Sequence, residues 1–142
     1  IFVSAFQNAS RQYDFQAPLT HAITRKFIHD SRLRVVGRDE ADLILEGVIR
    51  DYRLKEITTD KDDETTQFLC VVLASARLTE RATGKVVWEE KTMAGETSFY
   101  TRASGAFLPS VRSFTTEEEN RGASEALEQL ASDILYRTVE PW

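Results

Sequence analysis

The chain has 142 residues, of which 42% are hydrophobic and 29% charged, and both fractions are ordinary for a single globular domain. Its net charge of -5 argues against general nucleic-acid binding, which needs a basic surface. The only cysteine, Cys70, excludes an intrachain disulfide and leaves the redox compartment open. We therefore expect residues 1–142 to form one domain that binds no nucleic acid.

The first third of the chain predicts strands separated by one helix. Ile1–Phe6 is an apolar strand, and Pro18 suits the first turn of an amphipathic helix that continues to about residue 30. Leu33–Val36 predicts a short strand. Leu43–Leu54 predicts a longer one whose first half is apolar on both sides, which is typical of a central strand. Within it, Gly47 is a candidate bulge or close-packing point.

Two long strands and a closing helix follow. Thr65–Thr79 and Val86–Tyr100 predict the strands, joined by a tight turn in which Gly84 supplies a positive φ. A capping-box pattern at Thr116 opens the helix, whose apolar stripe comprises Ala123, Ala126, Leu127, Leu130, Ala131, Ile134 and Leu135. The order β-α-β-β-β-β-α predicts an α+β fold. We expect a two-layer sandwich with two helices on one face of a mostly antiparallel four- to five-stranded sheet.

Residue types that carry catalysis or bind metals occur here without the spacing that either needs. His21 and His29 are two helical turns apart, roughly 12 Å along the axis, too far to share one metal. Cys70 lies among apolar residues, which favours a buried, inert thiol. The acidic residues within 60–64 lack the calcium-loop spacing and indicate a solvated hairpin tip. The sequence therefore predicts no catalytic residue, no metal site and no cofactor, and argues against an enzyme.

Three surfaces remain as candidates for function. One is the outer, apolar face of Phe68–Leu73. A second is a predicted partner surface made of Phe99, Tyr100, Phe107, Leu108 and Phe114. Exposed apolar clusters mark partner sites, although such residues also cover cores or form dimers. The third is a basic set suited to a phosphate-bearing ligand, or else scattered solvated charge: Arg50, Arg53, Lys55, Lys85, Lys91, Arg102 and Arg112.

Several segments together resemble the LptE family, the outer-membrane lipoproteins of lipopolysaccharide assembly. They are Val3–Asn8, Leu19–Ile23, Arg34–Val36, Ala41–Ile49 with Tyr52, Ala76–Thr79, Thr83–Trp88, Thr116–Glu119 and Ala126–Ala131. Some of these segments are also similar to penicillin-binding-protein activators, curli-secretion lipoproteins and the amino-terminal domain of TolB. The strand order that ends in one long helix, together with the compact length, favours the LptE family.

The resemblance implies a non-catalytic lipoprotein on the periplasmic face of the outer membrane. Such a protein would be held by an amino-terminal lipid and would plug, and help to assemble, a large LptD-type β-barrel translocon. It would also bind lipopolysaccharide for delivery to the cell surface. The chain begins at Ile1 without an initiator methionine, so a preceding leader and lipid anchor are allowed. Placement near strand ends nominates Lys55, Lys85 and Lys91 as ligand-binding residues.

The alternative is another periplasmic lipoprotein that acts as an interaction module, either activating a cell-wall synthase or serving a secretion pore. A small hydrolytic enzyme is a weaker third option, which a pocket with a perturbed histidine or carboxylate would revive.

Overall fold

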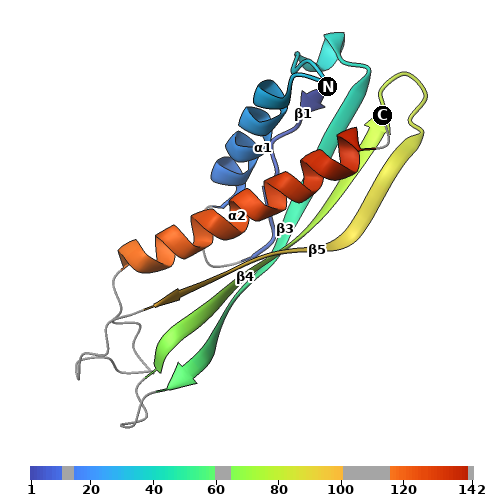
Figure 1. The fold of residues 1–142 in the computed structure, drawn as a ribbon. Coiled ribbons are helices and arrows are strands. Elements are labelled where there is room, and N and C mark those ends of the chain that lie inside the picture. The colour runs from blue at the N-terminus through green and yellow to red at the C-terminus, as the bar shows by residue number, and fades with distance from the viewer. Residues whose placement is uncertain (11–14, 60–64, 101–115, 141–142) are drawn as a thin grey trace.

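A long, twisted, three-stranded antiparallel ribbon forms the frame of the molecule (Figure 1). The computed structural model describes residues 1–10, 15–59, 65–100 and 116–140. In chain order the elements are β1 (Phe2–Val3), β2 (Gln7–Asn8), α1 (Gln16–Asp30), the 3-10 helix η1 (Arg38–Glu40), β3 (Leu43–Thr59), β4 (Thr65–Glu80), β5 (Val86–Tyr100) and α2 (Thr116–Val139). Both α-helices lie on the same face of the sheet, which confirms the predicted α+β sandwich.

The five-stranded sheet has the order β1-β3-β4-β5, with β2 also paired to β3. The β3–β4 and β4–β5 pairs are antiparallel, whereas β1 and β2 run parallel to β3. The predicted first strand, Ile1–Phe6, is thus divided into two short edge strands. Over the residues described, neither α1 nor α2 is both long and apolar enough to cross a bilayer.

The prediction of a strand at Leu33–Val36 was wrong. This segment is irregular and makes two backbone hydrogen bonds with the start of the chain. The amino group of Ile1 donates to the carbonyl of Arg34 (2.7 Å), and the amide of Val36 donates to the carbonyl of Ile1 (2.9 Å). Two hydrogen bonds to one residue, Ile1, do not make a strand ladder.

Helix α1 begins two residues earlier than Pro18, which therefore still falls in the first turn, where its missing N–H costs nothing. The helix ends at Ser31, whose positive φ of 64° turns the chain and whose amide donates to the Phe27 carbonyl (3.0 Å). The strand predicted over Leu43–Leu54 continues to Thr59.

The core lies between the helices and one face of the sheet. On β4 the predicted inward row is buried throughout: Phe68, Cys70, Val72, Ala74, Ala76 and Leu78. Leu45, Ile49 and Tyr52 of β3 continue this layer, and Leu19, Ile23 and Phe27 of α1 cover it. The predicted stripe of α2 is also buried, except that Leu135 is only partly buried at its margin. Cys70 is a buried thiol.

Two glycines allow close approach across this core. A Cβ at Gly95 would overlap the backbone carbonyl of Ala126 and crowd Leu130, so α2 packs directly on β5 at this point. A Cβ at Gly47 would overlap the ring of Phe6, which confirms Gly47 as a close-packing point.

Side chains of α2 follow β5 along its length. The indole N–H of Trp88 donates to the hydroxyl of Thr138 (3.2 Å) near one end, and the hydroxyl of Thr97 donates to Glu125 (2.7 Å) near the other. Between them, the backbone amide of Glu96 donates to the side-chain oxygen of Gln129. Helix α2 therefore satisfies an outer backbone donor of this edge strand as well as covering its inner face.

Candidate ligand-binding face

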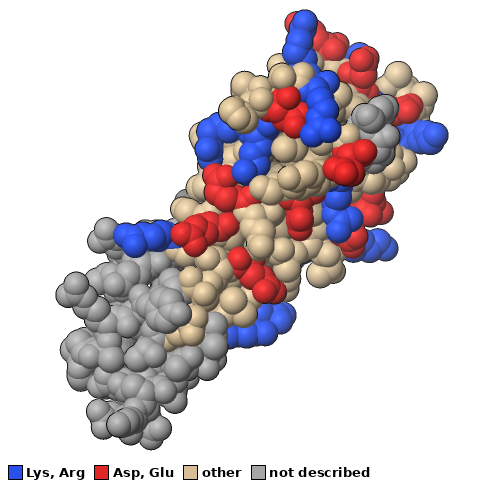
Figure 2. All heavy atoms as spheres, viewed as in Figure 1, with Lys and Arg blue, Asp and Glu red and all other residues tan. Residues whose placement is uncertain are grey.

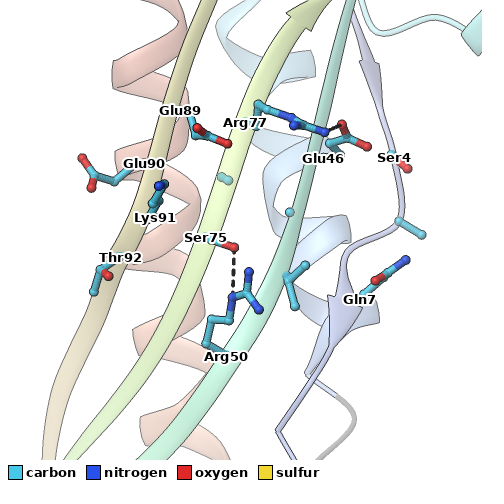
Figure 3. A pocket seen from close by; sticks show the side chains of 14 residues that line it. Ser4, Gln7, Glu46, Arg50, Ser75, Arg77, Glu89, Glu90, Lys91 and Thr92 are labelled. Atoms are coloured by element: carbon cyan, nitrogen blue, oxygen red, sulfur yellow. Dashed lines mark hydrogen bonds and ion pairs between the residues drawn. The ribbon is translucent and has the colours of Figure 1, made fainter. Parts of the chain in front are cut away.

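The face of the sheet that the helices leave open carries a polar hollow of about 660 Å³ (Figure 3). Residues of the β1–β2 segment, β3, β4 and β5 line it. The polar lining residues are Ser4, Gln7, Glu46, Arg50, Ser75, Arg77, Glu89, Glu90, Lys91 and Thr92. The apolar ones are small or medium-sized: Ala5, Val48 and Ala76. This composition suits a polar ligand, because a ligand site fixes orientation through convergent hydrogen-bonding and charged groups.

Two β-bulges shape the hollow, one in each neighbour of the central strand β4. On β3 the register skips Arg50, opposite the step from Leu73 to Ala74, and on β5 Lys91 and Thr92 together stand opposite Ser75. A bulge bends its strand and re-aims the side chains it carries. The open face therefore departs from a regular pleat on both neighbours of β4, at nearby positions along that strand.

One end of the hollow contains charges that are already paired. A guanidinium nitrogen of Arg77 lies 2.6 Å from a carboxylate oxygen of Glu46, and this hydrogen bond raises the pKa of Arg77. Glu89 adds a weaker attraction to the same guanidinium. Glu90 is bound from the helix side, where Arg137 of α2 lies 3.3 Å from its carboxylate.

The other end contains two cations without such partners. Arg50 donates from Nε to the hydroxyl of Ser75 (3.3 Å), and Lys91 is exposed. Among the described residues, neither cation lies within 4.0 Å of a carboxylate. The adjacent carboxylate of Asp51 is engaged by Arg53 Nε at 2.8 Å, and this hydrogen bond lowers the pKa of Asp51. Arg50 and Lys91 are thus free to meet an anion.

A second depression, of about 680 Å³, lies between α1 and α2. Ile28 and Tyr136 on its walls are 62% and 58% exposed. Glu128 lies between Arg25 (2.7 Å) and Lys26 (3.2 Å), and the hydrogen bond from Arg25 is the main cause of its lowered pKa. Figure 2 shows acidic and basic side chains interspersed on this side of the molecule. The groove is therefore amphipathic, with its central charges paired.

The three lysines nominated from the sequence lie far apart. Lys55 stands opposite Leu69, whereas Lys85 hydrogen-bonds through its carbonyl to the amide of Glu80. Leu69 and Glu80 are eleven residues apart on β4, which separates them by about 36 Å along an extended strand. Only Lys91 lines the hollow. The ligand-binding role of each lysine stays a prediction, and one small ligand cannot contact all three.

The predicted aromatic partner surface also stays a prediction. Phe99 and Tyr100 end β5, and their backbones pair with β4. Their side chains lie outside what the structure describes, as do Phe107, Leu108 and Phe114. The acidic tip at residues 60–64 and the basic residues at positions 102 and 112 are also outside the described ranges.

The two histidines and the outer apolar residues of β4 are the remaining candidates from the sequence. His21 and His29 are both exposed on α1. On the outer face of β4, Val71 is buried and its apolar neighbours Leu69 and Leu73 are half-buried. Within the described ranges, no group of three or more His, Cys, Asp or Glu side chains could hold a metal ion.

Among the lining residues of the hollow, only Arg50 and Lys91 belong to the basic set predicted from the sequence, and neither bulge was predicted. A signal was present in the spacing. Ile49 and Tyr52 both face the core although they are three residues apart, so strict alternation had to fail between them. The polar run Glu89–Thr92 interrupts β5 in the same way.

The fold is an α+β domain in which helices pack on one face of the sheet and the other face is open and hollowed. The family model LptE, described as lipopolysaccharide-assembly, matches residues 1–138. The chain belongs to this family of outer-membrane lipoproteins, as the sequence resemblance predicted.

Solved structures share the fold at low sequence identity. Rare lipoprotein B from Shewanella oneidensis is similar with a TM-score of 0.63 and 12% identity, covering 99% of this chain and 96% of that one. Protein XCC0632 from Xanthomonas campestris has a TM-score of 0.64 and 16% identity, covering 97% and 82%. A minor lipoprotein from Acinetobacter baumannii has a TM-score of 0.57 and 13% identity, covering 94% and 86%. No curated protein sequence matches this chain.

Proposed function

We propose that this protein is a non-catalytic, lipid-anchored component of the lipopolysaccharide translocon on the periplasmic face of the outer membrane. In this role it plugs a large LptD-type β-barrel, helps that barrel to assemble, and binds lipopolysaccharide on its way to the cell surface. The observation that carries the proposal is the family match over residues 1–138, nearly the whole chain.

The surface chemistry supports the plug role. The lumen of a large outer-membrane barrel is polar, so a plug needs a rigid core beneath a surface of mixed charge. Here the core is shared by both helices and the sheet, and the helix side presents interspersed acidic and basic groups (Figure 2). The open sheet face is polar as well. Both sides of the domain can therefore contact a polar wall.

Co-purification tests the plug role. The full-length, lipidated protein would be isolated from outer membranes under mild detergent, and its partners would be identified by mass spectrometry. An unrelated lipoprotein with the same type of anchor serves as the control. We expect the lipopolysaccharide-translocon barrel with this protein and not with the control. Recovery of a cell-wall synthase or a secretion pore in its place would contradict the proposal and favour the alternative interaction module.

Single charge reversals test the nominated lysines. Lys55→Glu, Lys85→Glu and Lys91→Glu would each be titrated with lipopolysaccharide at low and high salt. Because exposed charges act over roughly 10 Å at 0.1 M salt, lysines about 36 Å apart should report separately. We expect the largest, salt-dependent loss of affinity at Lys91, which lines the hollow. Unchanged affinity in all three variants would show that the ligand binds elsewhere.

A further inference from the structure

We propose that the hollow on the open sheet face binds the sugar–phosphate part of lipopolysaccharide, with the anionic group held between Arg50 and Lys91. The identity of this ligand rests on the proposed function, whereas the chemical class, an anionic saccharide, follows from the residues of the hollow. Figure 3 shows the two cations on either side of Ser75.

Both cations lie at irregularities in the strand pairing. Arg50 is the extra residue of the bulge in β3, and Lys91 belongs to the bulge in β5. The bulge in β3 falls opposite the step from Leu73 to Ala74, and the bulge in β5 falls opposite Ser75, so the two irregularities are close together along β4. Bulges interrupt regular ladder pairing and are common next to binding sites, where they re-aim side chains. Each of these two bulges carries a cation that lines the hollow, and Arg50 is bonded to Ser75 between them.

The charge distribution separates an anion-binding end from a hydroxyl-binding end. Arg50 and Lys91 have no carboxylate within 4.0 Å among the described residues, so they attract an anion. At the other end, Glu46 and Glu89 surround Arg77 and keep acceptor capacity for hydroxyl donors. A phosphate ion alone would form no favourable contact with these carboxylates. A sugar that carries an anionic group could place the anion between the cations and donate hydroxyl hydrogen bonds to the carboxylates.

The lining argues against acyl chains as the occupant. Ala5, Val48 and Ala76 supply little apolar surface, and the remaining lining is polar or charged apart from Gly47. Burying an acyl chain there would desolvate those polar groups while gaining little hydrophobic stabilisation. Hydroxyls of Ser75 and Thr92 instead offer hydrogen bonds to a saccharide.

The probe for this site is the phosphorylated core oligosaccharide of lipopolysaccharide, stripped of acyl chains, titrated calorimetrically into the 142-residue protein. The test variant is R50Q/K91Q. The matched control is R25Q/K26Q, which removes the same charge from α1 on the other side of the sheet. A second variant, R50K/K91R, keeps both charges. Thermal melts confirm that all four proteins are folded.

We expect R50Q/K91Q to weaken binding by about five- to tenfold, in line with the loss of two exposed charge-assisted contacts. R25Q/K26Q should bind like wild type, R50K/K91R should restore most of the affinity, and the dephosphorylated oligosaccharide should bind weakly. Equal loss in R50Q/K91Q and R25Q/K26Q would overturn the proposal, because net charge alone would then explain binding. Wild-type binding of intact lipopolysaccharide without binding of the oligosaccharide would also overturn it.

This result is independent of the barrel. If the oligosaccharide does not bind while the barrel still co-purifies, the hollow is not the site and the plug role stands. If the oligosaccharide binds as expected and no barrel is recovered, the saccharide site stands and the plug role fails.

Discussion

The two faces of the sheet are built from the same three long strands, yet they differ in almost every physical property. The covered face consists of fully buried apolar rows packed on two helices, with glycine where α2 comes closest. The open face is polar, bulged on two strands and hollowed around Ser75. Because successive residues of a strand point to opposite sides, each strand contributes to both faces without compromise. The comparison teaches that the residues that stabilise the fold and the residues of the proposed binding site lie on opposite sides of one backbone.

The largest contrast is expected from truncating one residue on each face. Leu130→Ala should lower the free energy of unfolding by about 2–5 kcal/mol, because Leu130 is fully buried against β5 and truncation leaves a cavity. Thr92→Ala on the open face should change it by less than about 0.5 kcal/mol. Urea denaturation measures both. Similar losses in the two variants would contradict the division between faces.

A Cβ added at the closest helix contact should have the next largest effect. Gly95→Ala places a methyl group against the carbonyl of Ala126 and the side chain of Leu130, and should cost about 1–3 kcal/mol because the helix must shift. Gly37→Ala is the matched control, since nothing lies within 4 Å of its added Cβ. Thermal melts of both proteins, monitored by circular dichroism, measure the difference. A Gly95→Ala protein as stable as the Gly37→Ala protein would refute the close packing of α2 on β5.

Thr138, a buried polar side chain of the covered layer, should contribute less. Thr138 is 1% exposed, accepts a hydrogen bond from the Trp88 indole and donates to the Ile134 carbonyl (2.8 Å). Thr138→Val keeps the shape but leaves the indole N–H without this acceptor, so we expect a loss of about 1–2 kcal/mol. Urea denaturation followed by tryptophan fluorescence measures it. Stability equal to that of wild type would show that water replaces the hydroxyl.

The smallest effect should come from acid. Hydrogen bonds from Arg53, Arg32 and Arg25 lower the pKa values of Asp51, Asp30 and Glu128 below 3.8, 3.8 and 4.5 respectively. A lowered carboxyl pKa stabilises the fold at pH values above the ordinary one, and this stability is lost as the pH falls through the folded-state pKa. The melting temperature should therefore decrease slightly from pH 6 to pH 3, and less so at high salt.

Neutralising variants compare the two faces in this experiment. Asp51→Asn on the open face and Glu128→Gln on the helix side should each remove part of the acid dependence. An acid dependence that neither variant changes would assign it to other carboxyl groups.

The covered face was predictable because its signals are periodic. The alternation in β4 and the helical stripe of α2 each identified buried residues correctly, since one face of each element must be apolar to form a core. The short strand predicted at Leu33–Val36 failed because pairing depends on a partner elsewhere in the chain. There, Ile1 bonds to it through only two backbone groups.

The open face was harder to predict because register determines it. Lys55, Lys85 and Lys91 share a charge and a place near strand ends or turns, but only the pairing along β4 shows how far apart the first two lie. The hollow depends on two bulges that lie close together on the two neighbours of β4, and each bulge arises from strand pairing that local sequence does not specify. The break in alternation was visible in the sequence of β3 and of β5 separately. The sequence did not show that the two breaks lie close together in the folded sheet.

The hydrogen bond from the Glu96 backbone N–H to the side-chain oxygen of Gln129 affects how this edge of the sheet can interact with other, unfolded chains. A free N–H at a sheet edge is a template on which a strand from another molecule can anneal, and this is how domain swapping and fibre growth begin. At Glu96 the backbone N–H is already hydrogen-bonded within the same chain, so it cannot pair with an incoming strand. In the proposed role beside the strands of a barrel, the domain therefore cannot pair with them through the Glu96 N–H, which leaves its faces as the contact surfaces there.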